Sequence, residues 1–186
     1  MRTDIMIDLE TLATSTDAAI LSIGAVKFNP FGNEVENPQC EKFYTRIDLD
    51  SCDKLNLQVS DDTIDWWSKQ SEAARNEAFD PNNREDINDA FQQLYKFCWG
   101  AQRVWSNGSG FDIVICETVF NRIHRATPWQ YWQVRDVRTM FDLGINPARP
   151  PITAHHALED AWNQAVGVQN VCRGLVSAGI NPFPKR

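Results

Sequence analysis

Residues 5–11 read Ile5-Met6-Ile7-Asp8-Leu9-Glu10-Thr11, an apolar run that ends in two carboxylates one position apart. In a β-strand, side chains two positions apart point to the same face, so Asp8 and Glu10 are expected to project together. A strand that is apolar on both faces is typical of the centre of an α/β sheet, where ligands gather at the carboxyl ends. Two neighbouring carboxylates repel each other unless a cation lies between them, and hard divalent cations take such oxygen ligands. The alternative is that one of these acids only caps the turn after the strand.

The chain of 186 residues is expected to form one domain, 1–186, because this length can bury a sizeable core. It shows no apolar run of membrane-spanning length and no signal-peptide pattern, which predicts a cytoplasmic protein with no membrane partner. The five cysteines are scattered without a CxxC pair, so we expect reduced core residues and neither a zinc site nor a disulfide framework.

The net charge of −7 is unevenly distributed. Residues 1–120 carry 10 Lys/Arg and 21 Asp/Glu (−11), whereas residues 121–186 carry 8 and 4 (+4). This asymmetry allows a basic surface beside an acidic pocket. It argues against strong sequence-independent binding of duplexes, which needs many phosphate contacts, but a short single-stranded end requires few.

The order of the expected elements predicts an α/β fold: a mixed five-stranded sheet flanked by helices. Three consecutive strands should form a meander, and two later strands should add to the sheet in parallel. The expected strands are 5–11, 19–28, 41–49, 103–106 and 133–137. The expected helices begin near Thr63, span 84–99 and 111–125, lie around Met140 and span 154–178, and the tail 180–186 is expected to be loosely ordered.

Three later residues could join the two acids of the first strand. Asp112 opens a helix after a strand and a glycine-containing loop, although it could simply favour the positive end of the helix dipole. Asp160 lies on the apolar stripe of the last helix and should face inward, where an unpaired carboxylate is costly without a cationic partner. His155 and His156 begin the same helix, and His155 is plausible as a general base.

These residues lie in three blocks that resemble the three exonuclease motifs of the DEDDh superfamily, which includes polymerase III proofreading subunits, ribonuclease T and oligoribonuclease. The blocks are Ile7-Asp8-Leu9-Glu10-Thr11, Asn107-Gly108-Ser109-Gly110-Phe111-Asp112 and His155-His156-Ala157-Leu158-Glu159-Asp160-Ala161. They occur in the family order and span nearly the whole chain.

The resemblance implies a ribonuclease H-like fold and a 3′–5′ exonuclease that releases nucleoside 5′-monophosphates with two Mg²⁺ or Mn²⁺ ions. The positions that match the metal-binding acids are Asp8, Glu10, Asp112 and Asp160. His155 matches the general base, because the family places four residues between that His and the Asp, and His156 does not fit. A water on one ion would be deprotonated by His155, and the second ion would stabilise the departing 3′ oxygen.

The second block departs from many family members, because three residues separate Asn107 from Phe111 instead of two. Together with residues 63–70, this spacing resembles a phage and prophage branch that includes DexA-type exonucleases, exodeoxyribonuclease VIII-like proteins and a mycobacterial exoribonuclease group. That branch acts on both DNA and RNA, so the expected partners are single-stranded DNA or RNA 3′ ends. The oligomeric state stays open, and dimers occur among relatives.

Several further residues are candidates for substrate binding, namely Thr11, Leu12, Asn107 and Phe111. Leu12 could wedge against the terminal base or fill the core. Trp66 and Trp67 could stack on bases, but adjacent helix positions point about 100° apart, so at least one should be packed.

Two other functions compete with the exonuclease. One is a ribonuclease H-like module that binds nucleic acid or a replication partner without turnover, although every acid of the motifs and the His are present. The other is a phosphatase or nucleotidase with a similar acidic cluster, which would not explain the spacing from His155 to Asp160.

Overall fold

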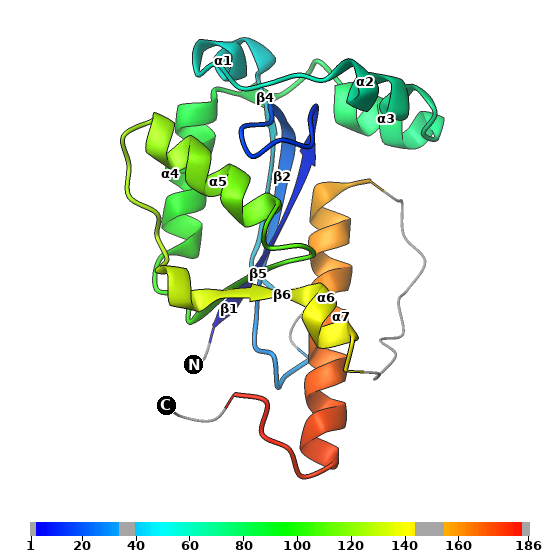
Figure 1. Ribbon diagram of the computed structural model, residues 1–186, viewed down its shortest axis with the longest axis vertical. Helices are drawn as coiled ribbons and strands as arrows, with labels where there is room; N and C mark the ends of the chain where they lie inside the picture. Colours follow the sequence, from blue (N-terminus) through cyan, green and yellow to red (C-terminus); the bar gives the residue numbers. More distant parts are fainter. Residues whose placement is uncertain (1–2, 34–39, 144–154, 184–186) are drawn as a thin grey trace.

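The computed structural model describes residues 3–33, 40–143 and 155–183 as a six-stranded sheet with helices on both faces (Figure 1). The strand order across the sheet is β4-β3-β2-β1-β5-β6. The strands are β1 (Asp4–Thr11), β2 (Ile20–Phe28), β3 (Lys42–Ile47), β4 (Arg84–Glu85), β5 (Arg103–Ser106) and β6 (Val134–Asp136). The helices are α1 (Leu49–Lys54), α2 (Asp61–Ser68), α3 (Glu72–Phe79), α4 (Ile87–Cys98), α5 (Asp112–Arg122), the 3₁₀ helix η2 (Tyr131–Gln133), α6 (Val137–Phe141) and α7 (Ala157–Ser177).

The apolar run of the first motif forms the centre of the sheet, as the sequence predicts. β1 pairs antiparallel with β2 and parallel with β5, and β2 pairs antiparallel with β3, which confirms the meander. The start of β1 is fixed to β5 by Asp4, whose fully buried carboxylate accepts hydrogen bonds from the Trp105 indole (2.8 Å) and the Arg103 guanidinium (3.3 Å). This pairing sets which β1 residues reach the carboxyl end of the sheet.

The prediction of five strands was wrong by one, because Arg84 and Glu85 form β4 beside β3 instead of the first turn of a helix. The helix expected over 84–99 begins at Ile87, where the Asp86 side chain caps it by accepting a hydrogen bond from the backbone N–H of Asn88. α1 is not among the expected helices, and the helix expected to begin near Thr63 begins at Asp61 as α2.

The helices form one layer on each face of the sheet (Figure 1). One face carries α4 and α5 over the larger core cluster, in which Phe91 and Phe120 are fully buried. The other face carries α7 and α6, which pack on Met6, Val26 and Trp105. At the end where β1 terminates, α2 and α3 lie near the beginning of α7 (Figure 1), so three separate segments converge there.

The close packing of α7 on the sheet depends on a glycine at the centre of β2. A Cβ at Gly24 would lie 2.2 Å from the backbone carbonyl carbon of Ala157, so only glycine permits this approach. Gly24 is also the residue opposite Asp8 in the β1–β2 ladder. The start of α7 is therefore held directly over the first acidic residue of β1.

The remaining expectations concern cysteines, membrane segments and the chain ends. None of the five cysteines forms a disulfide in the described part of the chain; four are buried and Cys40 is partly exposed. None of the described helices is long and apolar enough to cross a membrane. The last helix begins at Ala157, whereas the expected start at Ala154 and residues 184–186 lie outside the described ranges. Before that end, Phe183 packs edge-on against Trp105, with 5.8 Å between the ring centroids.

Candidate active site

Three of the predicted acids come together at the carboxyl end of β1. Asp8, Glu10 and Asp160 each offer a carboxylate oxygen, and these oxygens lie within 4.8 Å of one another. Asp8 and Glu10 share a face because they are two positions apart on β1, and Asp160 arrives from the first turn of α7. Asp160 therefore points inward, as expected, and its carboxylate meets those of β1.

The fourth predicted acid, Asp112, lies beside this group but is held by the backbone. It is the first residue of α5 and is 4% exposed, and its Oδ1 accepts a hydrogen bond from the backbone N–H of Leu9 (3.1 Å). β5 and β1 are parallel neighbours, so the loop after Ser106 leads Asp112 back to the residue between Asp8 and Glu10. The loop needs a left-handed turn at Gly108, where φ is +112°.

Burial raises the pKa values of all four carboxyl groups, and repulsion from the other acids adds to this at Asp8 and Glu10. Desolvation raises the pKa of Glu10 to about 8, and repulsion from Asp160 and Asp112 adds to the effect. Burial likewise raises the pKa of Asp112 to about 7, against the stabilising N–H of Leu9. The pKa of Asp8 is raised well above its usual range by desolvation and by the three other acids, and burial also raises the pKa of Asp160.

This donor set fits a divalent cation. It consists of hard carboxylate oxygens, and none of the ion pairs found between described residues involves these four acids. One acid is oriented by a neighbour that the sequence analysis did not identify, because the Gln164 side-chain amide donates a hydrogen bond of 2.7 Å to Asp8 Oδ1. Gln164 follows Asp160 by one helical turn on α7, and this i, i+4 spacing was the available signal.

His155 lies between the acids and the aromatic residues of α2. Its backbone N–H donates to Asp160 Oδ2 (3.1 Å), and its imidazole meets Trp66 edge-on with 4.9 Å between the ring centroids. The backbone of His155 adopts a left-handed conformation (φ 66°), which is uncommon outside glycine. The backbone of His155 therefore adjoins the acidic cluster, and its imidazole lies against the wall formed by α2.

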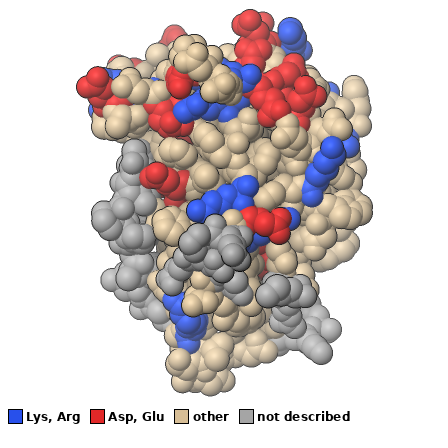
Figure 2. Space-filling view, turned by 180° about the vertical axis from the view of Figure 1, so that it is seen from behind, with Lys and Arg blue, Asp and Glu red and all other residues tan. Residues whose placement is uncertain are grey.

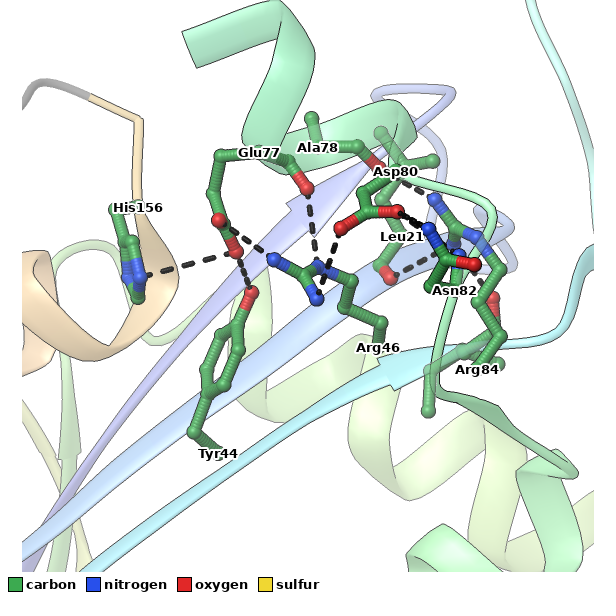
Figure 3. A network of polar contacts seen from close by, with 10 residues as sticks. Leu21, Tyr44, Arg46, Glu77, Ala78, Asp80, Asn82, Arg84 and His156 are labelled. Carbon is green, nitrogen blue, oxygen red and sulfur yellow. Dashed lines mark hydrogen bonds and ion pairs between the residues drawn. The ribbon is translucent and has the colours of Figure 1, made fainter. Parts of the chain in front are cut away.

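His156 faces a different set of residues, which sequence reasoning missed (Figure 3). It is the residue before α7, its ring stacks on Tyr44 (4.8 Å between centroids), and its Nε2 lies 3.8 Å from Glu77 of α3. Glu77 also accepts hydrogen bonds from the Tyr44 hydroxyl and from the Arg46 guanidinium (2.6 Å). The network ties α3 and β3 to the residue that follows His155, and no local sequence pattern indicated it.

A cavity of about 430 Å³ opens beside the acids. Glu10 belongs both to its wall and to the acidic group. Trp66 lines it and is 41% exposed, whereas Trp67 is 2% exposed and donates its indole N–H to the Thr11 carbonyl (2.9 Å). The expectation that at least one of the two tryptophans is packed is thus confirmed for Trp67. The cavity is lined by Leu9, Glu10, Thr11, Ala13, Thr14, Ser60, Asp62, Thr63, Trp66, Trp67 and Phe111.

The candidates for substrate binding divide between this cavity and other places. Thr11 and Phe111 line the cavity. Leu12 is 4% exposed and belongs to the main core cluster, as its core-filling alternative predicts. Asn107 is partly exposed in the loop after β5, outside the cavity lining.

The surface of the molecule does not present one continuous basic face in the view of Figure 2. Acidic side chains gather toward the upper end of this view, and Lys and Arg side chains are spread among them (Figure 2).

Comparisons with known proteins match this chain to nucleases. The 3′-5′ exoribonuclease Rv2179c-like domain family matches residues 3–172. An exodeoxyribonuclease of Enterobacteria phage T4 is 24% identical over 162 residues, covering 75% of this chain and 70% of the relative.

Two solved structures share the fold at low sequence identity. The nuclease domain of 3′hExo, a DEDDh family member bound to rAMP, matches with a TM-score of 0.55 at 13% identity, over 99% of this chain and 96% of that one. E. coli exonuclease I in complex with a dA13 oligonucleotide matches with a TM-score of 0.59 at 12% identity, over 94% of this chain but 41% of that one. The mixed sheet flanked by helices is thus the ribonuclease H-like fold of these nucleases. Since the family model covers most of its length, the chain belongs to the Rv2179c-like 3′–5′ exoribonuclease domain family, and it is a 3′–5′ exonuclease.

Proposed function

We propose that this exonuclease hydrolyses single-stranded nucleic acid one nucleotide at a time from the 3′ end, with two divalent cations, Mg²⁺ or Mn²⁺, and releases nucleoside 5′-monophosphates. The observation that carries the proposal is the shared position of Glu10, which belongs both to the acidic group and to the wall of the 430 Å³ cavity. A nucleoside in the cavity would have its phosphate at the carboxylates. We further propose that residues 1–186 act as one catalytic domain.

The cations would be held by Asp8, Glu10, Asp112 and Asp160. When bound, they supply a water of lowered pKa and offset the negative charge on the departing 3′ oxygen. The chain itself contributes the orientation of the ligands: Gln164 fixes Asp8, the Leu9 N–H fixes Asp112, and the His155 N–H fixes Asp160. Ligands held in this way need little rearrangement on binding.

His155 is the proposed general base. Its imidazole lies against Trp66, and its backbone N–H donates a hydrogen bond to Asp160, so the residue lies at the edge of the acidic cluster. A histidine has the pKa range suited to accepting a proton from the attacking water near neutral pH. The network of Tyr44, Glu77 and His156 would hold the neighbouring residue of the chain in place (Figure 3).

The cavity would bind the 3′-terminal nucleoside. The exposed face of Trp66 offers a stacking platform, and Thr11 and Phe111 form the opposite contacts near the acids. Asn107 in the adjoining loop would contact the strand. Because stacking reads no base in particular, the enzyme should remove all four nucleotides, and a cavity that holds one terminal nucleoside would explain why it requires an end.

The comparisons support a single-stranded substrate and a monophosphate product. The exonuclease I structure contains a dA13 oligonucleotide, and the 3′hExo nuclease domain contains rAMP. Since the family description names an exoribonuclease and the phage relative is an exodeoxyribonuclease, we propose that both polymers be tested.

The test is digestion of 5′-labelled single-stranded RNA and DNA, and of matched duplexes, with Mg²⁺, Mn²⁺ or EDTA. A ladder that shortens from the 3′ end, requires a divalent ion and is lost in Asp8→Asn and His155→Ala would support the proposal. Asp142→Asn is the matched control, because it removes one exposed carboxylate just after the end of α6 and should retain the ladder. Internal cleavage, or an unchanged ladder in EDTA, would contradict it.

A further inference from the structure

Arg138 lies over the loop that carries the second motif. The guanidinium carbon of Arg138, on α6, is 3.3 Å from the position that a Cβ would take at Gly108, so the group rests on the bare backbone of that glycine. The positive charge of Arg138 is close enough to lower the pKa of Asp112, although burial outweighs it and leaves that pKa raised. A side chain on a separate helix is thus placed next to an acid of the active site.

This placement is built into the backbone. The carboxylate of Asp136 accepts a hydrogen bond from the Ser109 N–H through Oδ2 (2.6 Å) and caps α6 by accepting from the Thr139 N–H through Oδ1 (3.2 Å). A single carboxylate therefore fastens the 107–110 loop to the first turn of the helix that bears Arg138. The left-handed φ of Gly108 and its missing side chain leave the space that the guanidinium occupies.

The guanidinium is available for a ligand. Arg138 is exposed, and none of the hydrogen bonds or ion pairs found in residues 3–33, 40–143 and 155–183 uses its side chain. By contrast, Arg122 is paired with Asp17, and Arg103 with Asp4. An exposed planar cation with five donors beside an acidic metal site is suited to a phosphate group.

The position of Arg138 relative to the cavity indicates which phosphate it would meet. Phe111 lines the cavity, Asp112 follows it at the acids, and neither Gly108 nor Arg138 is part of the cavity wall. If the terminal nucleoside fills the cavity and the scissile phosphate lies at the acids, the strand that leads away must pass outside the cavity, where the 107–110 loop and Arg138 lie.

We infer that Arg138 binds a phosphate on the 5′ side of the scissile bond and thereby selects oligonucleotides over isolated phosphodiesters. The inference rests on the proposed function, since it needs a strand whose 3′ end occupies the cavity. It assigns to Arg138 substrate binding and no step of the chemistry.

The experiment compares wild type with Arg138→Gln and Arg138→Lys on two substrates. One is a single-stranded decanucleotide; the other is the p-nitrophenyl ester of thymidine 5′-monophosphate, which has one phosphodiester and no upstream phosphate. Arg138→Gln should raise KM for the decanucleotide about 10- to 100-fold, as expected for a lost charge-assisted hydrogen bond, with kcat nearly unchanged. The kcat and KM for the p-nitrophenyl ester should not change. Arg138→Lys should have a KM for the decanucleotide between those of wild type and Arg138→Gln.

A binding measurement without turnover accompanies the kinetics. Fluorescence anisotropy of a labelled oligonucleotide, in an Asp8→Asn background, should show that Arg138→Gln lowers the slope of log K against log salt by about 0.7, the value for one phosphate contact with a single strand. Arg173→Gln is the matched control, because it removes one charge on α7, where Arg173 bonds to the Gly32 carbonyl. It should change neither KM nor the salt slope.

Unchanged KM and salt slope in Arg138→Gln would overturn the inference. So would a fall in kcat on both substrates with unchanged KM, because that result would mean that Arg138 only balances the charge of Asp112. An inactive wild type would contradict the proposed function instead, and the anisotropy slope would still decide whether Arg138 meets a phosphate.

Discussion

Replacing Gly24 by alanine tests the link between packing and the active site. The new methyl carbon would lie 2.2 Å from the carbonyl carbon of Ala157 and 2.2 Å from the amide nitrogen of Leu158, both backbone atoms. Carbon atoms in contact are normally about 3.5–4.0 Å apart, so β2 and the start of α7 must separate by more than about 1 Å. Asp8 stands opposite Gly24, and Asp160 is three residues beyond Ala157, so this shift pulls the acidic group apart.

The expected losses follow from the size of this displacement. Overpacking of this kind costs about 1–3 kcal/mol of the free energy of unfolding. A displacement of about 1 Å at a catalytic group can lower the rate about 100-fold. Activity should therefore fall far more than the folded fraction does, because the acidic residues would remain displaced even in the molecules that stay folded.

The assay measures the melting temperature, the kcat for a single-stranded oligonucleotide and the shift in melting temperature on adding Mn²⁺. Gly24→Ala should lower all three. Gly110→Ala is the control for stability, because no heavy atom lies within 4 Å of its added methyl carbon, and its melting temperature should match wild type. A Gly24→Ala protein with the melting temperature and kcat of wild type would refute the close approach of α7 to β2.

Three further predictions concern charge, stacking and the network behind the site. Without metal, Glu10 and Asp112 keep pKa values of about 8 and about 7 in the folded protein, so the protons they bind stabilise it below about pH 4, and this stability is lost as the pH rises toward 8. In chemical denaturation with EDTA, the free energy of unfolding should fall by a few kcal/mol between pH 4 and 8. At pH 8, Mn²⁺ at 100 times its Kd should restore about 2.7 kcal/mol of it. A free energy of unfolding that rises from pH 4 to 8 in EDTA would contradict this prediction. Trp66→Ala should raise KM about tenfold with little loss of stability, because Trp66 is exposed in the cavity. Trp67→Ala should lower the free energy of unfolding by about 3–5 kcal/mol, because Trp67 is buried. Equal effects of the two substitutions on denaturation would contradict both predictions. Glu77→Ala should lower the free energy of unfolding by about 3 kcal/mol and also lower kcat, because it removes the carboxylate that pairs with Arg46 and lies near His156 at the start of α7 (Figure 3). An unchanged denaturation midpoint would show that these contacts do not stabilise the protein.

The sequence was most informative where one residue pattern determines both the local secondary structure and the direction in which the acidic side chains point. The alternation of Asp8, Leu9 and Glu10 in a strand placed the two acids on one face, and the stripe of α7 turned Asp160 inward; both were visible without a structure. The strand Arg84–Glu85 was missed because it has two residues and is defined only by backbone pairing with β3. Propensity over so short a segment carries almost no signal.

The parts of the site that depend on tertiary contacts could not be predicted. Glu77 joins His156 from α3, about 80 positions earlier in the chain, and Arg138 reaches Gly108 only because Asp136 fastens α6 to the loop. Likewise, the choice between core and substrate for Leu12 depended on whether helices cover the loop after β1. Such contacts have no fixed sequence spacing, so local patterns do not report them.

The most direct test of the central claim follows metal binding and turnover in one titration. Mn²⁺ is added to the metal-free protein in a calorimeter, and the release of nucleoside 5′-monophosphate from a single-stranded oligonucleotide is measured at each concentration. Two ions should bind per chain, product release should rise with their binding, and Asp8→Asn should lose both. Product release at full rate in EDTA, or saturation with Mn²⁺ without any product, would contradict the account.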